Sequence, residues 1–129
     1  MQFNFEKLIA YQKSLDLVDF VYDTTEKFPK AEQFSLTDQF RRAAVSVSLN
    51  IGEGSSGTKK ESMNFLRISN RSVRECVVCT TIAHRRKYIP DEVHERSRKM
   101  LVEIAKLNSL KNPVDLRKPS TNYQLPTPN

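Results

Sequence analysis

The sequence predicts an all-α protein, folded as an antiparallel up-down-up-down four-helix bundle. Apolar residues recur at steps of three and four in four separate segments, which is the spacing of amphipathic helices. Short breaks that contain Pro or Gly separate these segments. The single segment that also alternates like a strand has no second such segment to pair with. Four amphipathic helices joined by short breaks pack most simply in up-down-up-down order.

The first predicted helix covers residues 6–28, and Pro29 ends it because proline disfavours helical geometry at the residue before it. Its apolar residues recur at steps of three and four, with Leu8 and Val21 beside them: Tyr11, Leu15, Val18, Tyr22 and Thr25. A second stripe, roughly 120° around the helix, is acidic: Asp16, Asp19, Asp23 and Glu26.

Residues 36–54 form the one ambiguous segment. Residues 45–51 alternate perfectly and would suit a half-buried strand. Helical spacing is also satisfied, and the missing partner strand decides for a helix, which Ser35 or Thr37 could cap. Its apolar positions are Leu36, Phe40, Ala43, Ala44, Val47 and Ile51.

Two further helices are predicted in the second half of the chain. Residues 58–88 contain no internal Gly or Pro, and one face carries Leu66, Ser69, Val73, Cys76, Val77, Thr80 and Ala83. The last helix begins at Pro90 or Asp91 and closes before Asn112-Pro113. We therefore expect a helical domain over residues 1–111 and a Pro-rich, disordered tail over residues 112–129.

Length and charge restrict the class of protein. The 129 residues fit one domain, and the formal net charge is +6. Residues 59–111 hold thirteen basic and six acidic side chains, whereas residues 1–58 hold six and eight. No apolar run is long enough to span a membrane and no signal peptide is recognisable, so a cytoplasmic protein is expected. The two cysteines suit a reducing compartment.

The third helix carries the strongest candidate for a binding surface. Five cations project within about 60° of one another at 100° per residue, nearly opposite the apolar face: Lys60, Arg67, Arg71, Arg74 and Arg85. Arg86 and Lys87 extend the row at its end. Because guanidinium groups match phosphate oxygens, an aligned row suits a nucleic-acid backbone. Pairing with the acidic stripe of another copy, or plain solvation, remains open.

Other chemistry finds less support. The Gly-rich loop over residues 52–60 has Thr58 where a phosphate-binding loop needs Lys, so a helix connection is expected there. Cys76, Cys79, His84 and His94 could supply zinc ligands, but a cysteine pair in mid-helix favours small buried thiols. We expect no metal and no cofactor. No nucleophile or paired acid and base with a supporting partner is recognisable, so no enzyme is expected.

Residues 39–54, with the sequence QFRRAAVSVSLNIGEG, resemble the signature of the bacterial four helix bundle protein family. This family is also called the S23 or 23S rRNA intervening-sequence protein family. Phe28-Pro29, Phe5-Leu8-Tyr11 and Ser72-Val73-Arg74-Glu75 resemble the family as well, so that the similarity covers about residues 3–110. Departures include Gly52 for a usual Ala, and Arg71, which strengthens the basic row.

The resemblance implies a fold similar to that of the accessory variability determinant of diversity-generating retroelements. That protein is a basic homopentamer that binds nucleic acid and a reverse transcriptase. The signature positions map onto Arg42, Ser46, Asn50, Glu53 and Gly54. Their chemistry suits a structural or subunit contact, with Asn50 and Glu53 accepting from Arg or backbone donors, and a ligand contact stays open.

The function predicted from these observations is a non-enzymatic, basic homo-oligomeric scaffold, with a pentamer favoured. It would bind the backbone of RNA or DNA through the basic row of the third helix. The alternative is an accessory protein of a diversity-generating retroelement that binds its reverse transcriptase and template RNA. A purely structural oligomer, in which basic and acidic stripes pair between copies, is a third possibility.

Overall fold

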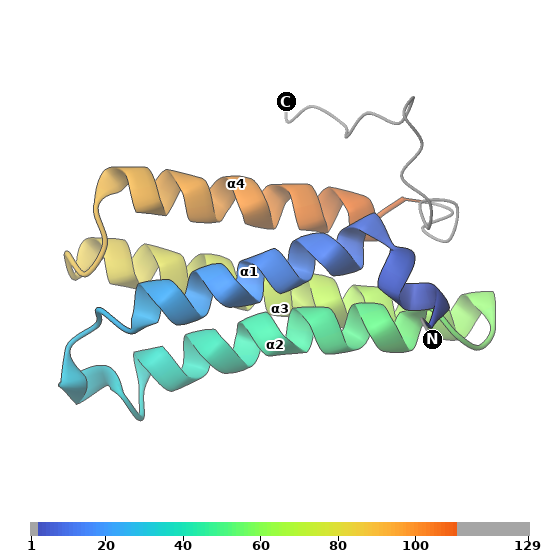
Figure 1. The fold of residues 1–129 in the computed structure, drawn as a ribbon, viewed down its shortest axis with the longest axis horizontal. Helices are drawn as coiled ribbons and strands as arrows, with labels where there is room; N and C mark the ends of the chain where they lie inside the picture. Colours follow the sequence, from blue (N-terminus) through green and yellow to red (C-terminus); the bar gives the residue numbers. More distant parts are fainter. Residues whose placement is uncertain (1–2, 111–129) are drawn as a thin grey trace.

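Four long helices lie side by side in the computed structural model, which describes residues 3–110 (Figure 1). They are α1 (Ile9–Thr25), α2 (Leu36–Gly54), α3 (Lys59–Arg85) and α4 (Asp91–Asn108). Two short 3₁₀ helices, η1 (Asn4–Lys7) and η2 (Lys30–Glu32), precede α1 and α2. The tail expected over residues 112–129 lies outside the described residues.

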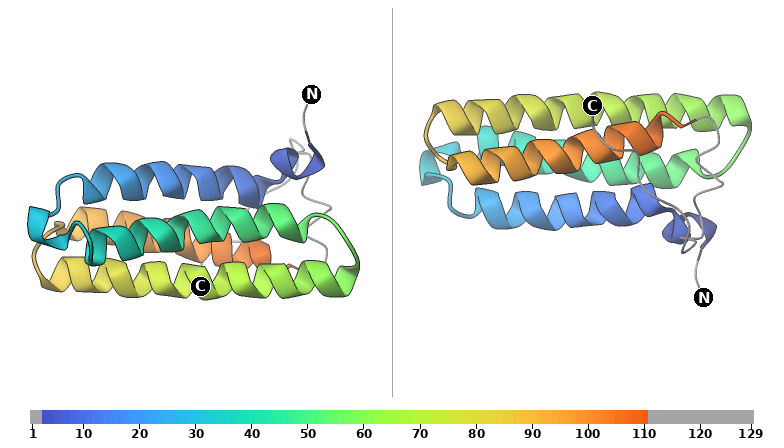
Figure 2. Two further views of the ribbon diagram at one scale, coloured as in Figure 1. Left: turned by 90° about the horizontal axis from the view of Figure 1, so that it is seen from below. Right: turned by 90° about the horizontal axis from the view of Figure 1, so that it is seen from above.

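The connections between consecutive helices lie at alternate ends of the bundle, so neighbouring helices in the chain run in opposite directions (Figures 1 and 2). Helix α1 packs against α2 and α4, and α3 packs against the same two helices. Helices α1 and α3 therefore occupy opposite corners of the bundle, as the views from below and from above also show (Figure 2). This is the predicted all-α, up-down-up-down bundle.

The ambiguous segment is a helix, as predicted. The apolar positions that the helical spacing selects are all buried: Leu36, Phe40, Ala43, Ala44, Val47 and Ile51. Leu49, which a strand would place on the same face as Val47 and Ile51, is exposed. The segment is helical because the bundle buries one stripe of its side chains at a period of 3.6 residues. The described residues also contain no strand with which this segment could pair.

Helix α1 differs from the prediction at both ends and in its buried face, and it ends at Thr25 instead of residue 28. It begins at Ile9 instead of residue 6, because Leu8 adopts an extended conformation after η1. Of the predicted apolar stripe, Leu15 and Tyr22 are 42% and 43% exposed. Thr25 of that stripe and the neighbouring Val21 are buried, and the other buried positions of α1 are Ala10, Ser14, Leu17 and Phe20.

Hydrogen bonds explain how small polar residues of α1 come to be buried. Ser48 Oγ of α2 donates to Ser14 Oγ at 2.8 Å, and Thr25 Oγ1 donates to the Val21 carbonyl at 2.7 Å. Because these hydroxyls are satisfied, they can enter the core and allow the helices to approach closely. The larger side chains of the predicted stripe are displaced to the flank of α1 that faces α2.

The helix ends follow local chemistry, with one correction. At α3, Thr58 Oγ1 accepts from the Glu61 N–H at 3.1 Å and the Glu61 carboxylate accepts from the Thr58 N–H at 3.2 Å. Hydrogen bonds to the Glu61 carboxylate from the Thr58 backbone N–H and from the Thr58 side chain lower the pKa of Glu61. At α2, neither Ser35 nor Thr37 provides the predicted cap. Ser35 forms no side-chain capping bond, and the Glu32 carboxylate accepts from the Leu36 N–H at 3.3 Å instead.

Candidate nucleic-acid interface

The outer face of α3 lies at a corner of the bundle and is basic along much of its length. All seven cations predicted for nucleic-acid binding are exposed: Lys60, Arg67, Arg71, Arg74, Arg85, Arg86 and Lys87. The opposite face of α3 is held in the core by buried residues that include Leu66, Val73 and Cys76. The packing of one face therefore fixes the other face toward solvent.

These cations have no anionic partner within residues 3–110. None of the seven forms an ion pair there, and Arg67 reaches only the Asn64 side-chain oxygen, at 3.5 Å. Glu75 is exposed on the same helix but pairs with none of them. Apart from this Arg67 contact, the guanidinium groups keep their donors available for an external anion. The face can therefore accept several phosphate groups at once.

The basic row is not continuous. Val78 and Ile82 are 57% and 42% exposed and lie between Arg74 and Arg85, beside a shallow hollow of about 410 Å³. The row divides into two parts. The first basic cluster is Lys59, Lys60, Arg67, Arg71 and Arg74, and the second basic cluster is Arg85, Arg86 and Lys87. Roughly 16 Å of helix separates Arg74 from Arg85 at about 1.5 Å per residue. The interruption was missed because only the charged positions of the arc were considered, although Val78 falls within it.

The second basic cluster lies on a turn that is fixed by backbone geometry. Lys87 has φ of 65°, in the left-handed region. The Tyr88 N–H donates to the Ala83 carbonyl at 2.8 Å, and the Lys87 N–H donates to the His84 carbonyl at 3.0 Å. This is the pattern of a helix C-terminus closed by a left-handed residue. The backbone of Lys87 therefore closes the C-terminus of α3, independently of what its side chain contacts.

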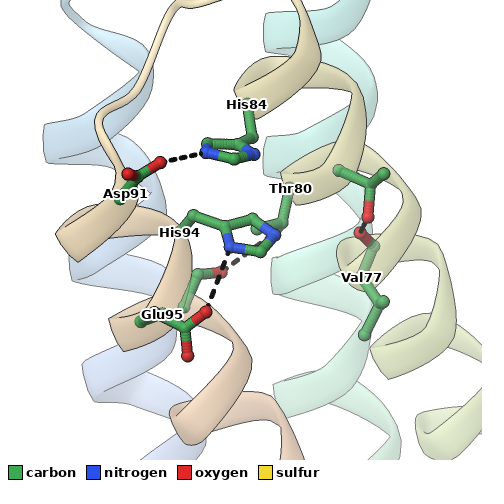
Figure 3. A network of polar contacts seen from close by, with 8 residues as sticks. Val77, Thr80, His84, Asp91, His94 and Glu95 are labelled. Carbon is green, nitrogen blue, oxygen red and sulfur yellow. Dashed lines mark hydrogen bonds and ion pairs between the residues drawn. The ribbon is translucent and has the colours of Figure 1, made fainter.

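Side chains also join the two helices at this turn (Figure 3). His84 Nε2 lies 2.6 Å from Asp91 Oδ1, and the His84 and His94 rings stack with centroids 4.2 Å apart. Thr80 Oγ1 and Ser97 Oγ are hydrogen-bonded at 2.8 Å. The histidines of the considered zinc set thus contribute to the α3–α4 packing. No three potential metal ligands converge in the part of the chain that the structure describes.

Both cysteines are buried, as expected for small core thiols. Burial is the main cause that raises the pKa of the Cys76 thiol, and the nearby Cys79 and Glu75 add to it. Burial, followed by the charge of Glu75, raises the pKa of Cys79 to about 11. Because the thiolate is the reactive form, these residues are poor nucleophiles at neutral pH.

The signature residues of α2 divide into two groups. Ser46 Oγ and Ser72 Oγ of α3 share a hydrogen bond of 2.8 Å, and Asn50 Nδ2 donates to the Ser46 carbonyl at 2.8 Å. Asn50 is thus a donor here, whereas an acceptor role was expected. Gly54 lies where α2 passes close to the first turns of α3, and Ser62 Oγ donates to its carbonyl. Ser46 and Gly54 thus contribute to the α2–α3 contact, whereas Asn50 forms its hydrogen bonds within α2.

Arg42 and Glu53, the other signature residues, are exposed. Arg42 reaches Asp38 at 3.9 Å, one turn away on the same helix. The Glu53 carboxylate, which was expected to accept from Arg or backbone donors, forms no hydrogen bond or ion pair with residues 3–110. Both side chains remain available on the surface of α2.

Two surface features lie on or beside α1, opposite the basic face. The acidic stripe of Asp16, Asp19, Asp23 and Glu26 is exposed, and α1 and α3 do not adjoin. A mainly apolar groove of about 550 Å³ runs between α1 and α2 and is lined by residues that include Phe3, Tyr11, Leu15, Val45 and Leu49. The sequence did not predict this groove, because the apolar stripe of α1 does not indicate which of its residues remain exposed after the helices pack.

None of the helices within residues 3–110 is both long enough and apolar enough to span a lipid bilayer.

The fold and the surface charges define the class of this protein: it is a four-helix bundle with a basic outer face on α3 and an acidic face on α1. Within that class, the chain belongs to the 23S rRNA-intervening sequence protein family, whose family model matches residues 6–109. A similar fold is found in a crystal structure from Bacteroides thetaiotaomicron VPI-5482, a protein of unknown function from the S23 ribosomal protein family. The two chains are 22% identical, with a TM-score of 0.72, and the match covers 78% of this chain and 94% of the other. No curated protein matches this chain.

Proposed function

We propose that this protein is a non-enzymatic, homo-oligomeric scaffold that binds the backbone of RNA or DNA through the outer face of α3. The observation that carries the proposal is the first basic cluster, which includes three exposed arginines without an ion-pair partner in residues 3–110. Uncompensated like charges on one helix face repel one another, so an external polyanion is a favourable way to neutralise them.

The chemistry of this face suits the phosphate backbone more than a base sequence. The exposed aromatic residues Phe3, Tyr22 and Phe34 lie on other elements, so no aromatic ring on the outer face of α3 offers a stacking platform. Stacking on aromatic side chains is a common way to hold single-stranded bases. Binding through α3 should therefore depend strongly on salt and only weakly on sequence.

Self-association is the second part of the proposal, and the resemblance to the retroelement protein favours five copies. The apolar groove between α1 and α2 supports it, because Leu49 and Leu15 leave apolar surface in water. Each copy adds a formal charge of +6 to the assembly. Several copies would raise the avidity for a long polyanion without any new contact.

The test is a charge reversal at the first basic cluster. In the variant Arg67→Glu/Arg71→Glu/Arg74→Glu we expect RNA and DNA affinity, measured by fluorescence anisotropy, to fall at least about tenfold, with a log–log salt slope smaller by about 3. The matched control Lys7→Glu/Lys27→Glu/Lys30→Glu changes the net charge equally at exposed positions away from α3. Equal losses in both variants would contradict a site on α3.

A reverse-transcriptase accessory role is the second candidate, and the apolar interruption of the basic row favours it. Val78 and Ile82 place apolar surface between two basic clusters, which suits a protein partner that holds nucleic acid jointly with this chain. The variant Val78→Glu/Ile82→Glu should abolish binding to a purified retroelement reverse transcriptase. Unchanged binding of that enzyme would reject this candidate.

A further inference from the structure

The Gly-rich loop over residues 52–60, the first turns of α3 and the end of α4 line a cleft of about 610 Å³. Its exposed lining includes three cations, Lys59, Arg67 and Arg74. Met63 and Leu110 add apolar surface, and Asn70 and Asn108 add carboxamides. The cleft thus joins the first basic cluster to a partly apolar, hydrogen-bonding recess.

Asn108 is the unusual residue of this cleft, because it is only 5% exposed and its Oδ1 has no hydrogen-bond partner within residues 3–110. Its Nδ2 donates to Ser69 Oγ at 2.9 Å and to Asn70 Oδ1 at 3.0 Å. Further hydrogen bonds hold both acceptors in place. Ser69 Oγ donates to the Val47 carbonyl, and Asn70 Nδ2 donates to Ser109 Oγ. The orientation of the Asn108 carboxamide is therefore determined by its neighbours.

A buried acceptor without a partner costs stability, and a donor brought by a ligand would recover that loss. The cations of the cleft call for an anionic group, and the exposed side chain of Met63 offers an apolar surface. A nucleotide carries all three complementary features: a phosphate, a flat apolar base face and an amine that donates hydrogen bonds.

We propose that this cleft holds one unstacked nucleotide of the bound strand, with its phosphate at Arg67 and Arg74 and an exocyclic amine of its base donating to Asn108 Oδ1. This inference rests on the proposed nucleic-acid function and adds a base contact to it. The continuing chain is a poorer occupant, because residues 111–129 hold three basic and one acidic side chain and would meet cations of the same sign.

Isothermal titration calorimetry of the full-length protein with AMP, CMP, UMP and ribose 5-phosphate tests the base contact. AMP and CMP should bind about tenfold more tightly than ribose 5-phosphate, and UMP, which lacks the amine, should bind more weakly than either. Asn108→Leu should remove the preference for AMP and CMP while leaving ribose 5-phosphate binding unchanged.

A second variant keeps the test decisive if Asn108→Leu does not fold. Met63→Ala removes apolar surface from an exposed side chain and should weaken AMP binding several-fold, whereas Phe34→Ala, a change at an exposed apolar residue outside the cleft and the groove, should not. Equal affinity for AMP and ribose 5-phosphate would overturn the inference. Displacement of AMP by a synthetic peptide of residues 111–129 would also overturn it, by assigning the cleft to the chain itself.

The result is separable from the proposed function. Salt-dependent RNA binding together with equal affinity for AMP and ribose 5-phosphate would leave the scaffold function standing and remove only the base contact. Absence of RNA binding by the wild-type protein would instead contradict the scaffold function itself.

Discussion

Gly54 lies where the end of α2 passes over the first turns of α3. A Cβ at this position would lie 3.2 Å from the Ser62 carbonyl oxygen and 3.3 Å from Phe65 Cβ, which is closer than ordinary contact. Gly54→Ala should therefore lower the free energy of unfolding, measured in urea, by about 1–3 kcal/mol through overpacking.

Gly52, two residues earlier in α2, provides the control for this change. A Cβ there would meet only the Phe5 ring at 3.6 Å, an ordinary contact. Gly52→Ala should leave the protein unchanged or stabilise it by up to about 1 kcal/mol, because alanine is the better helix former. Equal effects of the two substitutions would contradict the close-approach role of Gly54.

Cys79 links the stability of the protein to alkaline pH. Its pKa is about 11 in the folded protein and 9.0 in the absence of perturbation. As the pH rises above about 9, the unfolded chain loses this proton before the folded protein does, so the Cys79 thiol should lower the free energy of unfolding by about 1 kcal/mol per pH unit up to about pH 11. Urea titrations between pH 7 and pH 11 measure this slope.

Cys79→Ala is the control, because it removes the thiol while leaving the other titrating groups in place. The slope of stability against pH should be shallower in this variant than in the wild-type protein. Identical slopes would show that the Cys79 thiol does not contribute to the alkaline loss of stability.

At the scale of the elements, the end of α3 depends on a left-handed residue. Lys87 has φ of 65°, a conformation that costs a residue with a side chain about 1 kcal/mol and costs glycine almost nothing. Lys87→Gly should raise the free energy of unfolding by about that amount, which thermal denaturation would record as a higher Tm.

The matched variant Lys87→Ala removes the same side chain and charge but keeps a Cβ in the left-handed region. Its stability should stay at or below that of the wild-type protein. Stabilisation of both variants to the same degree would assign the effect to charge removal in the second basic cluster and not to backbone strain.

At the scale of the whole molecule, opposite charges occupy opposite corners. The basic face of α3 and the acidic stripe of α1 cannot neutralise each other within one copy, because α2 and α4 lie between the helices that carry them (Figure 2). A head-to-tail contact between copies would bring such unlike faces together and can close into a ring. The apolar groove between α1 and α2 offers a different contact, one that salt does not weaken.

Sedimentation in 0.1 M and 1 M salt should separate these two modes. If the groove mediates the self-association proposed above, Leu49→Glu should shift the protein toward monomer at both salt concentrations. Phe34→Glu, a change at an exposed aromatic residue outside the groove, should not. Dissociation of the wild-type oligomer in high salt alone would point instead to pairing of the charged faces.

Much of the fold was predictable from residue periodicity, and the reasons are local. The range of α2 agrees with the prediction at both ends, and Pro29 and Pro90 lie in the connections where helix breaks were expected. The exposure of the five cations on the predicted arc follows from the same periodicity, because a helix that buries one apolar stripe turns the opposite side outward. Arg86 and Lys87 are also exposed, but they lie beyond the last residue of α3.

The sequence by itself thus determined four helices, their order, and the polarity of the outer face of α3, because each depends on residues within one helix. Only the tertiary structure decided which residues of α1 are buried, since Ser14 enters the core through its hydrogen bond with Ser48 of α2. It also created the cleft at Asn108, whose surroundings come from helices about forty residues apart in the chain, joined at 2.9 Å between Asn108 and Ser69. Such features depend on how helices are rotated against one another, and no periodicity within a single helix encodes that rotation.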